Sequence, residues 1–245
     1  MSLIKKSLCV AAVLSAVFAA VAMAANITGT PGDDKLVGTT ASDTINGLAG
    51  DDEILGLARA TASSSTDDTI NGGNDNDELY GDSTCPPGAT NPDYCNKAES
   101  SKDGKDKVNG DSGNDAIFGQ GNDDTLNGGD GLDFLDGGSG NDVLHGNNSL
   151  DAATGGSGND QVFGDDGLDA LDGGSGNDTV DGGNDSDAIT GGSGKDTLKG
   201  GSGNDAIDSR DGEKDTVDCG PGNDYLRADR RGTDTITNCE NIDYP

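Results

Sequence analysis

The sequence predicts an all-β protein, a parallel solenoid in which two nine-residue units form each coil of eighteen residues. Three observations support this fold class. The hexapeptide GGSGND begins at Gly137, Gly155, Gly173 and Gly200, always a multiple of nine residues apart. An aspartate recurs at the sixth position of the units, and an aliphatic residue recurs at the eighth. With 42 glycines, no tryptophan and 3% aromatic residues in 245, the composition excludes a conventional core, and a repeat architecture is the alternative.

The eighth position of each unit predicts the strands. It is Val, Ile or Leu in all units but one, as at Leu36, Ile45 and Leu144, and the exception is Ala153. One apolar residue in nine fits a strand of about three residues whose middle side chain points inward. Two such strands face each other in one coil, and successive coils stack through main-chain hydrogen bonds.

Residues 1–24 have the features of a signal peptide. Lys5 and Lys6 precede an apolar run from Leu8 to Val21, and Ala22-Met23-Ala24 fits a cleavage site before Ala25. The alternative is an uncleaved anchor, but the run is short for a membrane span. We therefore expect a secreted protein without a membrane span after signal removal, with the periplasm as the alternative location.

Residues 25–245 are expected to form a single repeat domain with two insertions and a C-terminal cap. The insertions are placed at 56–62 and 81–100, after which the frame resumes at Ser63 and Ser101. The longer insertion is either a recognition tip or a tolerated surface loop. The cap covers 209–245, because a solenoid needs a distinct end. One-residue slips there displace the frame starts to Arg210, Cys219 and Asp229.

The sixth-position aspartate is the most constant feature of the repeat. The glycines vary more, since Gly146 opens GNNSLD and Gly164 opens GDDGLD. A turn that needed only a positive φ would keep glycine and let aspartate vary. The carboxylate is therefore required for itself, most simply as a metal ligand. The aspartates are Asp34, Asp43, Asp52, Asp68, Asp77, Asp106, Asp115, Asp124, Asp133, Asp142, Asp151, Asp160, Asp169, Asp178, Asp187, Asp196, Asp205, Asp215, Asp224 and Asp234.

This pattern resembles the RTX, or haemolysin-type, calcium-binding nonapeptide repeat, and the C-terminal stretch resembles that of small secreted bacterial proteins with this repeat. The resemblance implies a parallel β-roll. Multiple calcium ions would lie between turns of neighbouring coils, held by turn carbonyls and by the sixth-position aspartates. Calcium chemistry agrees, because Ca²⁺ takes six to eight oxygen ligands and accepts backbone carbonyls, whereas Mg²⁺ demands a tighter octahedral geometry. No ligand set in the chain suits a transition metal.

The net charge of −31 indicates which partners to expect. Such a field repels nucleic acid and anionic lipid, and it attracts cations. Stacked carboxylates about 5 Å apart repel one another strongly without a counter-ion. A thin apolar core does not offset that repulsion together with the chain entropy. We therefore expect a disordered metal-free chain that folds when calcium binds.

Four cysteines remain after the signal segment: Cys85, Cys95, Cys219 and Cys239. An even number in an exported chain predicts disulfides, although four cysteines allow three pairings. A zinc site is the alternative, but the spacing lacks two CxxC knuckles. Cys85 and Cys95 would close a small loop. Cys219 and Cys239 lie one coil apart, so they are expected to pair across adjacent coils.

The sequence indicates a non-enzymatic protein with a structural or interaction role. HExxH and GxSxG motifs are absent, His145 is expected on the surface, and the five glutamates after the signal segment lack the apolar surroundings of a catalytic acid. Two alternatives are an accessory module for extracellular polysaccharide modification and an ice- or surface-binding protein. The second would use outward turn residues, namely Ser139, Asn141, Ser157, Asn159, Ser175 and Asn177.

Residues eighteen apart should stack in one column, and one outward column is unusually apolar for an acidic protein. It consists of Ala116, Phe134, Ala152, Ala170, Ala188 and Ala206, flanked by Leu132, Leu150 and Leu168 in the turns. Contiguous exposed apolar surface usually marks a contact. The column is therefore a candidate face for self-association or for a protein partner. The alternative is that small side chains merely suit a tight sheet.

Overall fold

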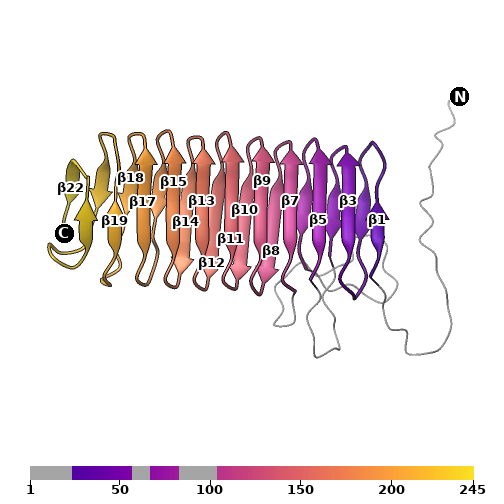
Figure 1. Cartoon of the computed structure of the whole chain (residues 1–245), viewed down its shortest axis with the longest axis horizontal. Helices are drawn as coiled ribbons and strands as arrows, with labels where there is room; N and C mark the ends of the chain where they lie inside the picture. The colour runs from indigo at the N-terminus through magenta and orange to yellow at the C-terminus, as the bar shows by residue number, and fades with distance from the viewer. Residues whose placement is uncertain (1–23, 57–66, 83–103) are drawn as a thin grey trace, which may run out of the picture.

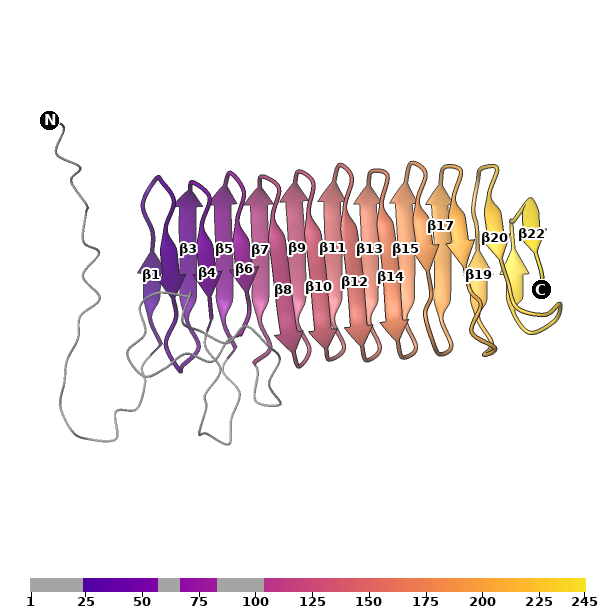
Figure 2. The ribbon, with the colours of Figure 1, turned by 180° about the vertical axis from the view of Figure 1, so that it is seen from behind.

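The computed structural model describes residues 24–56, 67–82 and 104–245. These residues form an all-β parallel β-roll made of two sheets, each with 11 strands. Odd-numbered strands lie in one sheet and even-numbered strands in the other, and neighbouring strands of a sheet are one coil apart in the chain, eighteen residues in the regular part of the array. Figure 1 and Figure 2 show the coils stacked along the long axis, from β1 at one end to β22 at the other.

The strands of the two sheets alternate along the chain. The first sheet contains β1 (Asn26–Thr28), β3 (Thr44–Ala49), β5 (Thr69–Asn74), β7 (Lys107–Ser112), β9 (Thr125–Asp130), β11 (Val143–Asn148), β13 (Gln161–Asp166), β15 (Thr179–Asn184), β17 (Thr197–Ser202), β19 (Thr216–Asp218) and β21 (Thr235–Thr237). The second sheet contains β2 (Lys35–Val37), β4 (Glu53–Leu55), β6 (Glu78–Tyr80), β8 (Ala116–Gly121), β10 (Phe134–Ser139), β12 (Ala152–Ser157), β14 (Ala170–Ser175), β16 (Ala188–Thr190), β18 (Ala206–Asp208), β20 (Tyr225–Arg227) and β22 (Asn241–Asp243).

The strands in the middle of the array are longer than the sequence predicts. Strands β7 to β15 have six residues, whereas a length of about three is seen only nearer the ends. The reason is that pairing continues through the glycines that open each unit, so that Gly138 pairs with Gly156. Gly138 has a φ of 92°, a conformation that costs glycine little. The turn between strands is correspondingly only three residues long.

The core is a single stack of eighth-position side chains between the two sheets. Leu135 pairs with Ala153, and Ala153 pairs with Leu171, all of them buried. The facing sheet contributes residues such as Leu144 and Val162, which are fully buried. The predicted inward direction of the eighth position is therefore confirmed. Each coil adds one side chain from each sheet, so the apolar core is narrow along the whole array.

Glycines at the predicted edges of the insertions belong to the coils. Gly56 and Gly81 are buried, and each takes the first position of a unit, with Asp68 and Asp106 in the sixth. Both added segments therefore stand inside a turn, between the first glycine and the aspartate, and not between two units. Frame counting missed this because it assigned the first position to the residue five before each aspartate.

The C-terminal segment continues both sheets through β19 to β22. Ser209 takes the first position of its unit, because its N–H donates to the Arg227 carbonyl at 2.9 Å as Gly191 N–H donates to Asp208. Ala228 does the same in the next coil on that side. The predicted frame starts at Arg210 and Asp229 are thus wrong by one residue, because the extra residue lies within the turn.

Candidate metal site

The sixth-position aspartates stack in two columns, one along each edge of the roll, at the turns that join the sheets. The column after even-numbered strands contains Asp43, Asp68, Asp106, Asp124, Asp142, Asp160, Asp178, Asp196, Asp215 and Asp234. The column after odd-numbered strands contains Asp34, Asp52, Asp77, Asp115, Asp133, Asp151, Asp169, Asp187, Asp205 and Asp224.

One oxygen of each carboxylate is fixed by the neighbouring coil. The N–H of Asp124 donates to Asp142 Oδ1 at 2.8 Å, and the N–H of Asp142 donates to Asp160 Oδ1 at the same distance. The second column repeats this contact, as between the Asp133 N–H and Asp151 Oδ1 at 2.8 Å. The bond links the coils through a side chain and sets the orientation of the carboxylate plane. A side chain without an oxygen at this place would lose it.

The other oxygen, Oδ2, lacks a hydrogen-bond donor in most of the described turns. A buried acceptor without a donor is costly, and a charged one is more costly still. A repeated deficiency of this kind indicates that something outside the chain supplies the missing interaction. The aspartates concerned include Asp52, Asp77, Asp106, Asp115, Asp133, Asp142, Asp151, Asp160, Asp169, Asp178, Asp187, Asp196, Asp205 and Asp224.

The first glycine of each unit keeps the space beside Oδ2 open. A Cβ added to Gly137 would lie 2.6 Å from Asp142 Oδ2 and 2.6 Å from the Gly155 carbonyl oxygen of the next coil. The same conflict with Oδ2 occurs at every described first-position glycine from Gly29 to Gly200. Carboxylate and carbonyl oxygens therefore converge on a space that no side chain could share. This glycine is present in every unit from Gly29 to Gly200, and the sequence analysis had not separated it from the more variable glycines of the motif.

The variable glycines are at the second and fourth positions, and there the requirement is conformational. Both positions have a positive φ in the units that begin at Gly47 and Gly72 and in those from Gly110 to Gly200, including units without glycine there. In the unit that begins at Gly146 and lacks both of these glycines, Asn147 has a φ of 77° and Ser149 a φ of 87°. Asparagine tolerates this region better than most residues, so the turn survives such replacements. Two different physical reasons thus account for the three glycines of the motif.

Burial of the columns makes the carboxyl groups poor acids in the metal-free fold. Burial, followed by the charges of neighbouring carboxylates such as Asp160, raises the pKa of Asp142 to about 7 despite the backbone hydrogen bond that opposes it. The pKa of Asp187 is raised to about 7 by the same causes. For Asp106 the pKa rises to about 10, since Asp82 adds a second carboxylate to the effect of burial. A cation beside Oδ2 would favour the ionised form.

The donor set fits a hard divalent cation. It consists of carboxylate oxygens and main-chain carbonyl oxygens, which Ca²⁺ prefers. In the described part of the chain, no three His, Cys, Asp or Glu side chains cluster as a metal centre. Carbonyl oxygens of the turns must therefore supply much of any coordination. Thiolate and imidazole, the usual ligands of transition metals, play no part in the columns.

The ends of the first column differ from its middle. Asp43 Oδ2 accepts a hydrogen bond from the Thr39 N–H, and its Oδ1 accepts one from the Ala25 N–H at 2.6 Å. At the other end, Asp234 Oδ2 accepts from Ser209 Oγ and from the Asp229 N–H, both at 3.2 Å. The terminal carboxylates thus find donors within the protein. In the second column, Asp34 Oδ2 likewise accepts from the Thr30 N–H at 2.5 Å.

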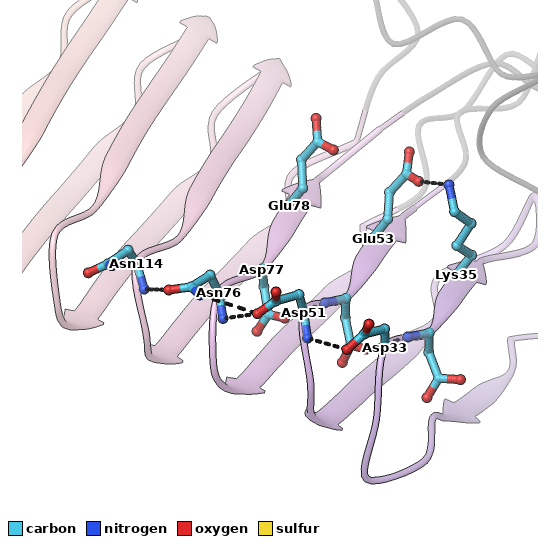
Figure 3. Close-up of a pocket in the computed structure, with 10 residues that line it drawn as sticks. Asp33, Lys35, Asp51, Glu53, Asn76, Asp77, Glu78 and Asn114 are labelled. Carbon is cyan, nitrogen blue, oxygen red and sulfur yellow. Dashed lines mark hydrogen bonds and ion pairs between the residues drawn. The ribbon is translucent and has the colours of Figure 1, made fainter.

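A second ladder runs along the rim of each column through the fifth position. Figure 3 shows part of it, in an open hollow near the N-terminal coils. The Asn76 N–H donates to Asp51 Oδ1 at 3.0 Å, and the Asn114 N–H donates to Asn76 Oδ1 at 2.8 Å. Asn159 and Asn177 continue the same pattern on the other edge. Fifth-position amides and carboxylates therefore serve the fold.

The structure places two cysteines, and one acidic residue that the sequence analysis missed, at the C-terminal end. Cys219 and Cys239 form a disulfide. Cys85 and Cys95 lie outside the described residues, and so do residues 1–23 of the expected signal peptide. Glu240 occupies the sixth position of the last turn, where its Oε2 accepts the Asp224 N–H at 3.1 Å. The signal for it was Ile242, two residues later, at the place of the eighth-position aliphatic residue. No helix among the described residues could cross a membrane.

The expected apolar column lies on the outer face of the second sheet. Ala152 pairs with Phe134 on one side and with Ala170 on the other, and Ala188 and Ala206 continue the row. Phe134 is 42% exposed, and the leucines in the adjoining turns are 49 to 55% exposed. These leucines occupy the fifth position, where other units place a hydrogen-bonding side chain.

Comparison with known proteins agrees with this geometry. The family model for the RTX calcium-binding nonapeptide repeat (4 copies) matches residues 28–58, 64–83, 101–135, 118–151, 128–162, 145–180, 154–189, 181–213 and 190–226. A comparison with curated proteins gave no match. The family match covers most of the chain and the same units that build the two aspartate columns. The chain therefore belongs to the RTX calcium-binding nonapeptide repeat family.

Proposed function

We propose that this protein is secreted and that it folds when several Ca²⁺ ions bind along the two aspartate columns, giving a rigid rod with a structural or interaction role. The proposed carboxylate ligands are the sixth-position aspartates from Asp34 to Asp224. The observation that carries the proposal is the row of buried Oδ2 atoms without donors, each except that of Asp224 beside a space kept open by a first-position glycine. Calcium binding by the family supports it.

Folding coupled to calcium follows from the charge of the columns. Consecutive carboxylates in a column lie one coil apart, about 4.8 Å in a parallel stack. The narrow core buries one aliphatic side chain per unit, which is little against the entropy of ordering nine residues. Bound cations would remove the repulsion and add ligand bonds, so binding energy becomes folding energy. A calcium concentration typical of extracellular fluid would then trigger folding after export.

The test is a calcium titration of chelated protein at neutral pH, followed by circular dichroism and by direct counting of bound calcium. We expect an irregular spectrum in chelator and a cooperative gain of β structure on adding calcium. Magnesium at the same concentration should produce a smaller gain of β structure. A fully β-rich spectrum in chelator, or folding without bound calcium, would overturn the proposal.

The interaction role has a candidate surface in the apolar column of the second sheet together with Leu132, Leu150 and Leu168. A fifth-position asparagine accepts a hydrogen bond from the next coil, as Asn114 Oδ1 does from the Leu132 N–H at 2.8 Å. A leucine side chain at this position cannot accept such a bond. Leucine there costs a coil-to-coil bond and exposes apolar surface, which favours a contact over mere packing. Replacing Leu168 and Ala170 with lysine should lower the mass measured by light scattering in calcium if copies associate through this face. An unchanged monomeric mass, with no captured partner that the variant loses, would refute it.

The ice-binding alternative finds less support in the turns. The side-chain amide of Asn159 donates to Asn141 Oδ1 at 3.2 Å, and Asn177 donates to Asn159 at 3.0 Å. These amides are thus engaged along the ladder and are not arrayed for an external lattice. The only histidine, His145, lies with its Nδ1 2.9 Å from Asp165 Oδ2 and stacks on Phe163. That arrangement is typical of a surface side chain and supports the non-enzymatic interpretation.

A further inference from the structure

The last turn of the second column is built differently from all the regular turns before it. Strand β21 ends at Thr237 and β22 begins at Asn241, so only Asn238–Glu240 connect them. In frame terms, Thr237 is a ninth-position residue and Asn241 is the next seventh-position residue. In a regular unit the same interval contains six residues, as Gly146–Asp151 does between His145 and Ala152. The chain is therefore three residues shorter here. An aspartate on this shorter connection would stand further from the preceding coil.

Glutamate compensates for the shorter turn. Glu240 Oε2 accepts the Asp224 N–H at 3.1 Å, just as Asp224 Oδ1 accepts the Asp205 N–H at 2.8 Å one coil earlier. The longer side chain thus reaches the position that an aspartate carboxylate holds in the other turns. Glu240 continues the column by its chemistry and its place, although it falls outside the nine-residue pattern.

Two carboxylates face each other at this end of the column without a compensating charge from the chain. Asp224 is fully buried, and its Oδ2 has no hydrogen-bond donor. Burial raises the pKa of Asp224, and Glu240 raises it further through its charge and hydrogen bond. Among the ion pairs of the described residues, none includes Asp224 or Glu240. Two such groups at close range need a cation to remain ionised together.

The disulfide holds the two halves of this pair in register. Cys219 is the first residue of the turn that ends at Asp224, and Cys239 directly precedes Glu240. Their Cα atoms are 5.1 Å apart. Cys219 also has a Cβ where the units from Gly29 to Gly200 have glycine, so the open space of the repeated sites is partly filled on this side. Glu240 is exposed to solvent.

We propose that Asp224 and Glu240 together hold a terminal calcium ion, distinct in composition from the repeated sites, and that the Cys219–Cys239 disulfide positions Glu240 for it. This inference rests on the proposed function. It differs from the repeat pattern in assigning a glutamate ligand and a covalent support. Removing a group that orients a metal ligand without binding the metal itself typically weakens metal binding by about 10- to 100-fold.

Tyr225 offers a local reporter, because it follows Asp224 directly and is 44% exposed. Terbium, used as a luminescent substitute for calcium, should show tyrosine-sensitised emission in the wild type, and Tyr225→Phe should remove the part of it that Tyr225 sensitises. Glu240→Gln should lower that Tyr225-dependent part and bind one calcium fewer, while circular dichroism in calcium still shows the folded roll. The matched control is Glu213→Gln, which removes a charge from an exposed turn glutamate. It should retain both the emission and the count.

A Cys219→Ser/Cys239→Ser variant completes the test. It should bind terbium at the Tyr225-reported site about tenfold more weakly or worse, with the remaining calcium count unchanged. If the wild type folds with calcium but Glu240→Gln keeps the full count and emission, this inference is overturned while the proposed function stands. If the wild type neither binds calcium nor folds with it, the proposed function itself fails.

Discussion

Without calcium, the folded chain should be stable only where pH is low enough for its buried aspartates to be protonated. In the metal-free fold, burial and neighbouring carboxylates raise the pKa of Asp142 and Asp151 to about 7 and that of Asp169 to about 6. In the unfolded chain these groups keep the ordinary value of 3.8. The folded metal-free chain therefore binds more protons than the unfolded chain. Its stability is present at low pH and is lost as pH rises through about 6 to 7.

The structure gives the size of this effect as a proton count. Six aspartates with a pKa of about 7 and three with a pKa of about 6 would together carry roughly seven protons at pH 6 in a folded metal-free chain. The unfolded chain would carry about 0.1 proton on the same nine groups. The nine are Asp52, Asp77, Asp115, Asp142, Asp151, Asp169, Asp178, Asp187 and Asp215.

The assay combines circular dichroism in chelator with calorimetric calcium titrations in buffers of different ionisation enthalpy. At pH 7.5 we expect a disordered chelated chain that releases almost no protons when calcium folds it. Near pH 5.5 the chelated chain should regain β structure, and calcium should then displace several protons. Equal β content at pH 5.5 and 8 in chelator would refute the reasoning. So would the absence of proton release from a chelated chain that is folded at the lower pH.

Three further predictions concern single residues. Asp142→Ala should raise the calcium concentration needed for half-folding several-fold more than Asn141→Ala, since Asn141 serves only the rim ladder; equal midpoints in calcium titrations would contradict this. Gly155→Ala should weaken calcium-driven folding, because its Cβ would lie 2.6 Å from two oxygen atoms; Ser157→Ala, in the same strand, is the control and should fold normally. Ala153→Leu should stabilise the calcium-bound roll by about 1 kcal/mol in urea unfolding by filling space between stacked leucines; a lower midpoint would show that the site is already full.

The sequence predicts the parts of this structure that depend on the period alone. Asp142 and Asp160 lie eighteen residues apart, so their stacking follows from counting, and so does the inward direction of Leu144. The strand length did not follow, because pairing through Gly138 depends on a backbone conformation that the pattern does not specify. Counting also failed wherever a turn changes length. Gly56, Gly81 and Ser209 keep their places in the coil, and the added residues are absorbed further along the same turn.

Glu240 was missed for the same reason, since its turn is shorter and its residue type differs. The information was nevertheless present in the spacing of two other residues. Cys239 follows Cys219 by about one coil, and Ile242 follows Glu240 by the interval that separates every sixth-position aspartate from its aliphatic partner. Alignment on the eighth-position aliphatic residue, rather than on aspartate, recovers the last unit, although Ile242 itself is 36% exposed at the end of the array. The inward side chain is the better anchor because the core tolerates no insertion, whereas a turn at the surface does.

At three of the four column ends, the terminal carboxylate has a hydrogen-bond donor for Oδ2 within the protein, whereas the fourth end, at Asp224 and Glu240, is the one for which a terminal calcium ion is proposed above. At one end, threonine N–H groups satisfy Oδ2 of Asp34 and Asp43. At the other, Ser209 and the Asp229 N–H satisfy Asp234. In the first column, the turns whose Oδ2 lacks a donor therefore lie between end units whose carboxylates are already served by the protein. A solenoid needs such distinct ends, and here the same position in the repeat changes from proposed metal ligand to hydrogen-bond acceptor through donors in its own or a neighbouring turn.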